Sequence, residues 1–322
     1  MEKESIAVLT SGGDAPGMNS AIRAVVRAAA SYGLEAKGVI RGFDGLMDNN
    51  IIDLNIRSVS DIIHHGGTML GTARSPRFKT EEGMQQAVEV CKERNISGVV
   101  VIGGDGSFRG ARDLSERGIP CVGIPCTIDN DIACSDYSIG YDTACNTAID
   151  MVDRLRDTMM SHSRCSVVEI MGNKAGFLTL STAIAVGATA IIVPELPFDF
   201  YHDIIEKINV AKKSGKRHFI IAVAEGIGHV EELAHDIQRE TGIETRATIL
   251  GHVQRGGAPD AKDRIVSTKM GYLAVQLLAQ GIGNRIVAVK DDKIVDYDIF
   301  EALNMKKSLD LNEYNMALRI SL

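Results

Sequence analysis

The sequence has little of what marks a zinc, membrane or secreted protein. Its six cysteines form no Cys-x-x-Cys pair, and no His-x-x-x-His or His-Glu-x-x-His motif accompanies them, which argues against a zinc site. The longest apolar stretches, such as residues 188–193, fall well short of the ~18 residues that a membrane span needs. The chain starts with charged residues that run directly into a short apolar segment, so we expect no signal peptide. Reduced, buried cysteines in a cytoplasmic protein are the simplest interpretation.

An excess of positive charge is also missing. Lys and Arg number 35 against 42 Asp and Glu, which gives a net charge of -7. This balance argues against a nucleic-acid partner and against a polybasic contact with a membrane. The chain can still bind anions where a few arginines gather in one cleft.

What the sequence does have is a repeating alternation of short β-branched runs and amphipathic segments, with 32 glycines against 7 prolines. This pattern predicts strand–turn–helix units on a mainly parallel sheet, an α/β fold. We expect strands at residues 6–9, 99–102, 122–124, 167–170, 190–193, 219–223 and 286–289. We expect helices at about 18–32, 142–157, 177–186 and 263–278, followed by a polar C-terminus.

Two glycine-rich turns, at 12–14 and 103–107, each follow an apolar strand and precede a helix. Glycines let a phosphate chain approach the backbone, and a helix N-terminus offers unpaired donors. In the second turn, Asp105 could hold Mg²⁺ together with phosphate oxygens. One such turn would as readily be an ordinary tight turn with an aspartate cap, but two of them at strand ends favour phosphate binding. The chain has neither the P-loop motif nor the dinucleotide-binding glycine motif.

A polar loop from Cys126 to Asp131 follows another expected strand. Asp129 and Asp131 could divide the work of phosphoryl transfer, one accepting a hydroxyl proton and the other supporting a metal. Thr127 offers a hydroxyl to a phosphate oxygen. On composition alone an Asx-rich surface turn is the more common explanation, and the nearby glycine turn adds weight to the functional one.

Several basic residues are candidates for holding phosphate, because arginine presents a fixed fork of donors. They are Arg74, Arg164, Arg246, His252 and Arg255. Taken singly, each arginine is more often a solvated surface residue. The glycine-flanked segment 251–257, which carries the last two of them, has the composition of a phosphate clamp.

Four blocks of sequence are specific when they are taken together. They are Leu9–Asn19, Gly103–Ser107, Thr127–Asp131 and Arg246–Gly257, and Asp263-Arg264 follows the last of them. In this order the blocks resemble those of bacterial 6-phosphofructokinases, and the resemblance runs from about residue 5 to about residue 300. The Gly-Gly-Asp-Gly turn alone is less specific, since NAD kinases and lipid kinases carry it too.

The resemblance implies two similar three-layer αβα domains with mainly parallel sheets and an active site in the cleft between them. Residues 1–138, with part of the segment 256–305, would bind the nucleotide and Mg²⁺, and residues 139–255 would bind the sugar phosphate. The implied activity is transfer of the γ-phosphoryl group of ATP to the 1-hydroxyl of fructose 6-phosphate, a step of glycolysis. A homotetramer with shared sites is also implied.

Carried over by position, the resemblance makes Asp129 the base and Asp105 the Mg²⁺ ligand, with Asp131 close by. The residues expected around the nucleotide and the transferring phosphate are Gly13, Arg74, Ser75, Gly104, Gly106, Ser107, Gly110 and Thr127. Those expected around the sugar phosphate are Met171, Gly172, Glu225, His252 and Arg255. Arg164 and Arg246 match residues that reach across from a neighbouring subunit.

Departures from the family pattern leave two alternatives open. Pyrophosphate-using relatives have Asp at the position of Gly106 and Lys at that of Cys126, so ATP is favoured over pyrophosphate as the donor. Cys126 also replaces a usual glycine, and Asn173 stands where relatives commonly have arginine. These two changes keep open a weakly active paralogue that binds sugar phosphate and serves as a sensor.

The effector site of the family, for ADP or phosphoenolpyruvate, is matched in part. The matching residues are Arg23, Arg27, Arg156, Gly187, Lys216 and His218, whereas Ile56, Thr189 and Ser214 depart from the pattern. We therefore expect regulation by either effector to be weakened or altered.

Overall fold

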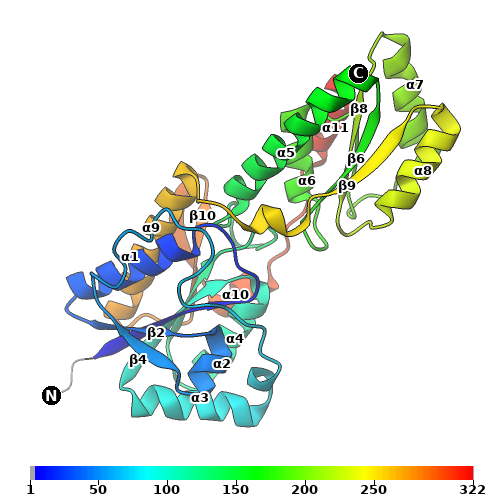
Figure 1. Ribbon diagram of the computed structural model, residues 1–322. Helices are drawn as coiled ribbons and strands as arrows, with labels where there is room; N and C mark the ends of the chain where they lie inside the picture. Colours follow the sequence, from blue (N-terminus) through cyan, green and yellow to red (C-terminus); the bar gives the residue numbers. More distant parts are fainter. Residues whose placement is uncertain (1–3, 322) are drawn as a thin grey trace. The chain divides into compact units, whose positions relative to one another are not determined.

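The computed structural model describes residues 4–321 and divides the chain into two compact units (Figure 1). Unit 1 runs to Thr127 and adds Ile132–Thr143 and Arg255–Lys307. Unit 2 consists of Ile128–Asp131, Ala144–Gln254 and the segment from Ser308 onward. The domain boundaries expected from the sequence stay a prediction: they put the loop at 128–131 in the first domain and residues 139–143 in the second, and they ended at about residue 305.

Unit 1 contains a seven-stranded sheet in the order β11-β10-β5-β4-β1-β2-β3. Neighbouring strands are parallel except at the two edges, where β3 runs against β2 and β11 runs against β10. The strands are β1 (Ser5–Ser11), β2 (Glu35–Val39), β3 (Ile51–Leu54), β4 (Ile96–Gly103), β5 (Cys121–Pro125), β10 (Arg285–Lys290) and β11 (Lys293–Asp298). Every residue of β1 and β5 is buried, as expected for parallel strands covered on both faces.

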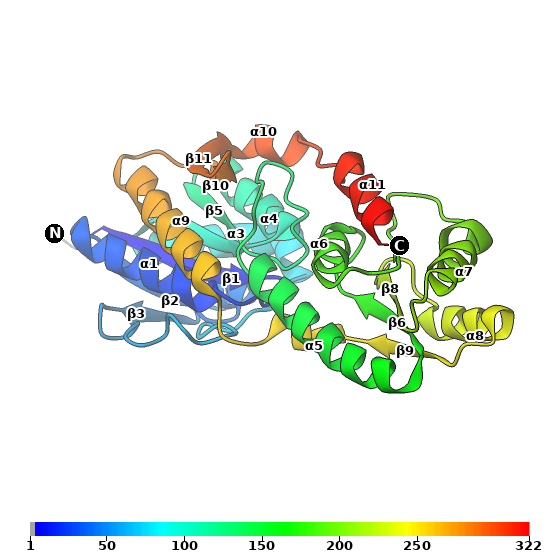
Figure 2. The same cartoon turned by 90° about the horizontal axis from the view of Figure 1, so that it is seen from above.

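Helices cover both faces of this sheet (Figures 1 and 2). On one face α1 (Met18–Ser31) and α9 (Ala261–Ala279) lie side by side. They approach closely because Gly271 of α9 has no side chain, and a Cβ there would lie 2.6 Å from the Cβ of Ala24. The other face carries α2 (Gly42–Met47), α3 (Glu81–Glu93), α4 (Asp105–Glu116) and α10 (Ile299–Asn304), with a 3-10 turn at Arg77–Lys79.

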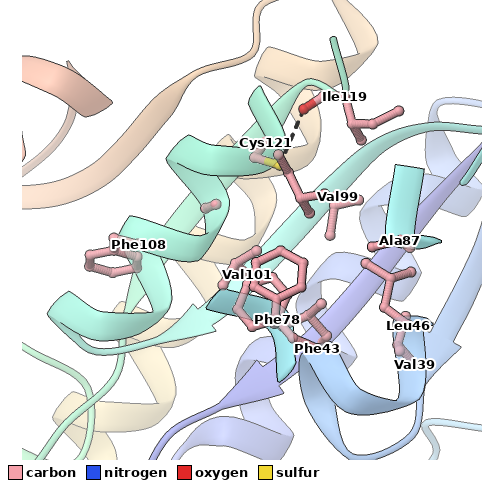
Figure 3. Close-up of a cluster of buried hydrophobic side chains, with 14 of the residues drawn as sticks. Val39, Phe43, Leu46, Phe78, Ala87, Val99, Val101, Phe108, Ile119 and Cys121 are labelled. Carbon is pink, nitrogen blue, oxygen red and sulfur yellow. Dashed lines mark hydrogen bonds between the residues drawn. The ribbon is translucent and has the colours of Figure 1, made fainter. Parts of the chain in front are cut away.

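The core under α2, α3 and α4 has two stacked aromatic rings near its centre (Figure 3). Phe43 and Phe78 lie with ring centroids 4.2 Å apart and pack in one cluster with Val99 and Val101 of β4. Gly110 of α4 lies against these rings, since a Cβ there would come within 2.8 Å of Phe43. Core packing is therefore one reason for glycine at position 110, a reason that the sequence pattern did not reveal.

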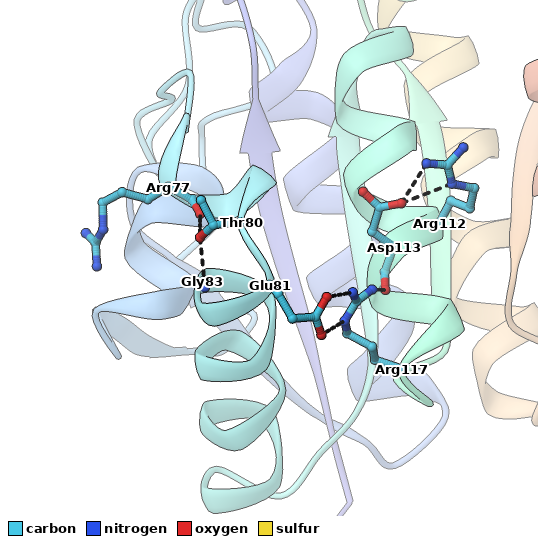
Figure 4. A network of polar contacts seen from close by, with 7 residues as sticks. All are labelled: Arg77, Thr80, Glu81, Gly83, Arg112, Asp113 and Arg117. Carbon is cyan, nitrogen blue, oxygen red and sulfur yellow. Dashed lines mark hydrogen bonds and ion pairs between the residues drawn. The ribbon is translucent and has the colours of Figure 1, made fainter.

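Polar contacts join α3 to α4 at the surface (Figure 4). Arg117, just after α4, pairs with Glu81 and donates to the backbone oxygen of Asp113 at 2.8 Å. Thr80 caps α3, and its hydroxyl accepts a hydrogen bond from the amide of Gly83 at 3.2 Å. Because Glu81 is exposed, water screens its ion pair, and the buried cluster of Figure 3 holds these helices more strongly.

Unit 2 contains a four-stranded, wholly parallel sheet in the order β7-β8-β6-β9. Its strands are β6 (Cys165–Ile170), β7 (Ala190–Ile192), β8 (Phe219–Ala224) and β9 (Thr245–Ile249). One face is covered by α7 (Glu206–Lys213), which follows a π-helical turn at Tyr201–Ile205, and by α8 (Val230–Thr241). The other face carries α6 (Phe177–Val186) and α11 (Leu311–Ile320), while α5 (Tyr141–His162) begins in unit 1 and continues into unit 2.

The predicted α/β class with mainly parallel sheets is confirmed, and all seven strands expected from the sequence are present. The sequence indicated only a polar C-terminus, but residues of this segment form the helix α11. The hydroxyl of Tyr314 in α11 donates to the backbone oxygen of Ile191 in β7 at 3.0 Å and so holds the helix against the sheet of unit 2. Within residues 4–321, no helix combines the length and the apolar character that a membrane crossing requires.

A buried carboxylate holds two segments of unit 1 together. Asp263 of α9 is fully buried and accepts hydrogen bonds from the Tyr137 hydroxyl at 2.6 Å, the Gly140 amide at 2.6 Å and the Thr143 amide at 3.1 Å. The Thr143 hydroxyl is a fourth donor. Burial raises the pKa of Asp263, and the donors oppose that shift.

The carboxyl group of Asp142 lies beside this cluster and is hydrogen-bonded to that of Asp260, the N-cap of α9. Burial, then the hydrogen bond and charge of Asp260, raise the pKa of Asp142 to about 6, while Lys262 opposes the shift and Asp263 adds to it. Because this pKa exceeds the ordinary 3.8, the stability from the protonated carboxyl is present below that value and is lost as the pH rises through about 6.

We predict that Asp142→Asn raises the free energy of unfolding, and does so more at about pH 8 than at about pH 5, because the amide donates to Asp260 without a titrating proton and the wild type loses stability progressively between the ordinary pKa of 3.8 and about 6. Urea denaturation at the two pH values measures this difference. The same change in stability at both would contradict the prediction.

Candidate functional site

Three strands of unit 1 end next to one another at the same edge of the sheet. The register pairs Ser11 of β1 with Gly103 of β4, and Gly103 with Pro125 of β5. Both glycine-rich turns and the Cys126-Thr127 pair therefore follow adjacent parallel strand ends, where open α/β sheets bind ligands.

The turn after β4 leads directly into α4, whose N-cap is Gly104. A Cβ at Gly106 would meet nothing within 4 Å, and a Cβ at Gly104 would have only the Cβ of Thr127 at 4.0 Å. This open backbone at a helix N-terminus suits an anion. Ser107 has a further role, because its buried hydroxyl donates to the backbone oxygen of Ser11 at 3.0 Å and ties α4 to β1.

Asp105 is the first residue of α4. Its carboxylate is half exposed, and Oδ2 accepts from Nε of Arg109, one turn along the helix, at 2.9 Å. Within residues 4–321, no three His, Cys, Asp or Glu side chains gather as a metal-binding group. One accessible carboxylate beside an anion site fits Mg²⁺, which takes one or two protein carboxylates and completes its shell with phosphate oxygens and water.

An arginine lies over the first glycine turn. A Cβ at Gly13 would be 2.1 Å from Nη1 of Arg255, so any side chain there would displace this guanidinium. Nε of Arg255 is buried and has no hydrogen-bond partner among the described residues. The structure thus brings together two residues that the sequence analysis assigned to different phosphates.

The segment 72–75 returns to the same turn. The hydroxyl of Thr72 donates to the backbone oxygen of Gly12 at 2.8 Å, and Arg74, two residues further on, is exposed. The Ser75 hydroxyl donates to Asp44 of α2, so it orders this segment. Thr72 was not expected at the site, because a single threonine outside the glycine-rich blocks carries no recognisable signal.

Cys126 is a packing residue. It is 1% exposed, and its amide donates to the backbone oxygen of Gly103 at 2.9 Å. Burial, with smaller contributions from the charges of Asp263 and Asp14, raises the pKa of the Cys126 thiol well above its usual range. Because the thiolate is the nucleophilic form, this cysteine is protected from oxidation and alkylation.

The loop that carries the two carboxylates turns sharply at its centre. Asn130 is buried and adopts a left-handed backbone conformation with φ 51°, which asparagine tolerates better than most residues. Asp129 and Asp131, on either side of it, are half-buried. Both carboxylates therefore keep partial access to solvent or substrate.

In unit 2 a carboxylate orders the turn after β6. Oε2 of Glu225 accepts from the amide of Gly172 at 3.2 Å and from that of Asn173 at 3.0 Å. The amide of Met171 donates to Oε1 of the fully buried Gln254 at 2.9 Å. The three residues expected around the sugar are thus brought together. Gln254 was not expected at the site, and its only sequence signal was its position two residues after His252. His252 itself is exposed.

A second carboxylate of unit 2 joins two predicted phosphate ligands. Oε2 of Glu244 lies 2.8 Å from Nε of Arg164, and its Oε1 lies 2.9 Å from Nη2 of Arg246. These hydrogen bonds lower the pKa of Glu244. Both arginines were expected from the sequence as phosphate ligands, whereas the glutamate was not.

Part of the predicted effector set gathers in unit 2. The guanidinium of Arg156 donates to the backbone oxygen of Val186, next to Gly187, and Nζ of Lys216 donates to that of Ser321 at 2.9 Å. Burial lowers the pKa of both Lys216 and His218, and the charge of Arg156 adds to each shift. Arg23 and Arg27 lie on α1 of unit 1.

Comparison with known proteins identifies the family. A family model described as Phosphofructokinase matches residues 5–278. The chain belongs to the phosphofructokinase family. Within the family, ATP-dependent 6-phosphofructokinase of Clostridium tetani is 52% identical over 316 residues, which cover 98% of this chain and 99% of the relative. The enzyme of the same name from Bacillus subtilis is 49% identical over 317 residues, with the same coverage.

Solved phosphofructokinase structures share the fold. Phosphofructokinase from Saccharomyces cerevisiae matches with a TM-score of 0.88 at 33% identity, over 99% of this chain and 48% of the yeast chain, so this protein spans about half its length. Pyrophosphate-dependent phosphofructokinase from Marinobacter aquaeolei matches with a TM-score of 0.87 at 20% identity, over 99% of this chain and 91% of the other. Because a pyrophosphate-dependent phosphofructokinase shares this fold, the fold alone does not identify the phosphoryl donor.

Proposed function

We propose that the protein transfers the γ-phosphoryl group of ATP to the 1-hydroxyl of D-fructose 6-phosphate, giving fructose 1,6-bisphosphate and ADP. The observation that carries this proposal is 49–52% identity, over nearly the whole length of both chains, with bacterial proteins named ATP-dependent 6-phosphofructokinase. The open glycine turns at adjacent strand ends support it, because they suit a polyphosphate. The reaction belongs to glycolysis, and we infer a cytoplasmic enzyme.

Unit 1 would bind the nucleotide and the cation. The backbones of Gly13, Gly104 and Gly106 would face the phosphates, with Arg74 supplying positive charge, while Ser75, Ser107 and Gly110 shape the surroundings. Asp105 would hold Mg²⁺ with phosphate oxygens, and Asp131 would support it. When bound, the cation would neutralise charge on the phosphate oxygens.

Asp129 would act as the base. A carboxylate oxygen of Asp129 would accept the proton of the sugar 1-hydroxyl as that oxygen attacks the γ-phosphorus in line with the leaving ADP. Thr127 would donate its hydroxyl to an oxygen of the transferring group. The half-buried carboxylate of Asp129 supports this role, since it is accessible without being fully solvated.

Unit 2 would bind most of the sugar phosphate. Met171, Gly172 and Glu225 would contact the sugar, and His252 and Arg255 would bind its 6-phosphate. Arg164 and Arg246 would contribute from a neighbouring subunit, so we infer a homotetramer. The order that Glu225 and Gln254 impose on the turn at 171–173 supports this assignment.

The sequence differences bear on the two alternatives. Gly106 borders open space, which suits the longer ATP chain better than pyrophosphate. The buried, protonated Cys126 adds no reactive group beside the phosphates, so it gives little support to a catalytically retired paralogue. We also propose that an ADP or phosphoenolpyruvate effector binds near Arg156, Lys216 and His218, with a response altered by Ile56, Thr189 and Ser214.

A fructose 1,6-bisphosphate assay with Mg²⁺, run in parallel with ATP and with pyrophosphate, tests the proposal. Turnover with ATP alone is the expected result. Turnover with pyrophosphate would overturn the assignment of the donor. No turnover with either donor, alongside measurable binding of fructose 6-phosphate, would make the protein a sensor.

A further inference from the structure

We propose that Glu244 is a positioning residue for sugar-phosphate binding, which holds the guanidinium groups of Arg164 and Arg246 in a fixed arrangement for the 6-phosphate. This inference rests on the proposed function, because it takes the phosphate of fructose 6-phosphate as the anion that these two arginines bind. Nothing in the four sequence blocks points to Glu244, which stands two residues before the last of them.

The sheet of unit 2 fixes where the carboxylate lies. Parallel strands β6 and β9 pair Cys165 with Thr245, so Arg164 and Glu244 occupy equivalent positions just before the two strands. The amide of Cys165 donates to the backbone oxygen of Glu244 at 2.9 Å, which continues the pairing. Arg246, two residues beyond Glu244 along β9, extends to the same side.

Glu244 divides its two oxygens between the two arginines. Oε2 accepts from Nε of Arg164 at 2.8 Å, and Oε1 accepts from Nη2 of Arg246 at 2.9 Å and from its Nε at 3.3 Å. A guanidinium has five donor hydrogens. These bonds engage the inner edge of each group and leave donors on both that can bind an anion.

The charges favour positioning over competition with the substrate. Two guanidinium groups and one carboxylate carry a net charge of +1, so the cluster still attracts a phosphate after Glu244 has paired. Without the carboxylate, like charges would drive the two arginines apart, and the side chain of Arg246 is already 74% exposed. Ordering a long side chain on binding costs conformational entropy. Glu244 meets that cost before the substrate arrives.

The first test is Glu244→Gln in the assembled enzyme, with fructose 6-phosphate binding followed by calorimetry and turnover followed in the same preparations. An amide can accept from one arginine only and presents donors to the other. We expect Kd and KM for fructose 6-phosphate to rise about tenfold, because two arginines must then be ordered on binding. We expect KM for ATP, kcat and Tm to stay near their wild-type values.

The matched control is Glu240→Gln, which removes an exposed carboxylate of α8 that pairs with Arg239. It should leave all of these constants unchanged. If Glu244→Gln behaves like this control, or if it tightens fructose 6-phosphate binding as removal of a competing anion would, the inference is wrong. If the wild-type protein bound fructose 6-phosphate but did not turn it over, the proposed function would be wrong and the inference about Glu244 would stand.

A double-mutant cycle separates positioning from general stability. If Glu244 acts through the arginines, Glu244→Gln should add nothing to the rise in Kd when both Arg164→Ala and Arg246→Ala are already present. An undiminished effect in that background would overturn the inference. Should Glu244→Gln lower Tm, Glu244→Asp is the second variant, and its shorter carboxylate should give a rise in Kd between wild type and Gln.

Discussion

Replacing Asp129 by serine is expected to lower kcat for phosphorylation of fructose 6-phosphate by about 10²–10⁴-fold, because general acid–base catalysis by a positioned side chain contributes about that much. Serine cannot take up the proton of the attacking hydroxyl at neutral pH. The fold should be unaffected, since Asp129 lies in a half-buried loop outside the two hydrophobic clusters. The measurement is steady-state kinetics with ATP and Mg²⁺, together with Tm.

The control is Asp236→Ser, which removes an exposed carboxylate of α8 that pairs with Arg239. This variant should keep wild-type kcat. The prediction for Asp129 would fail if its serine variant turned over within a few-fold of wild type. If Tm fell together with kcat, the lower kcat would be explained by loss of structure in the loop. Asp129 would then not be the catalytic base.

The sequence predicted the strands well, for a physical reason. Strands covered on both faces, such as β1 and β4, bury nearly every residue, so they appear as continuous apolar runs that no exposed segment imitates. The other four strands, β2, β3, β9 and β11, are partly exposed and lack such runs, and none of them was expected. The glycine turns were recognised because glycine, which has no side chain, marks positions where a ligand or another segment can approach the backbone closely.

The residues that were missed act through single long-range contacts. The role of Glu244 depends on its contact with Arg164, which is eighty residues away in sequence. The pairing of β6 with β9 brings the two residues together. Thr72 depends in the same way on Gly12. A pattern along the chain cannot reveal such pairs, because the partner is set by strand register. The protonated state of Cys126 also required the structure, since it follows from burial.

The largest expected loss of stability comes from Asp263→Ala. The side chain is fully buried, and four donors from Tyr137, Gly140 and Thr143 converge on its two oxygens. Alanine would leave these donors unpaired in a site that water does not reach. Each unsatisfied buried donor costs about 1–3 kcal/mol, and the costs are not additive, so we expect the free energy of unfolding to fall by about 3–5 kcal/mol.

Two further variants test whether the loss of stability comes from the unpaired donors. One keeps an acceptor at position 263 and removes the charge, and the other removes an exposed carboxylate elsewhere as a control. Asp263→Asn keeps the shape and one acceptor oxygen, and it removes a carboxylate whose pKa is raised by burial, so it should cost less than alanine. Asp53→Ala removes an exposed carboxylate of β3 that pairs with Lys37, and it should change stability by less than about 0.5 kcal/mol. Urea denaturation of the three variants gives the ranking. If Asp263→Ala cost no more than Asp53→Ala, the segment around Tyr137 would have to be held by other contacts, and the convergence of donors on Asp263 would not be what fixes it to α9.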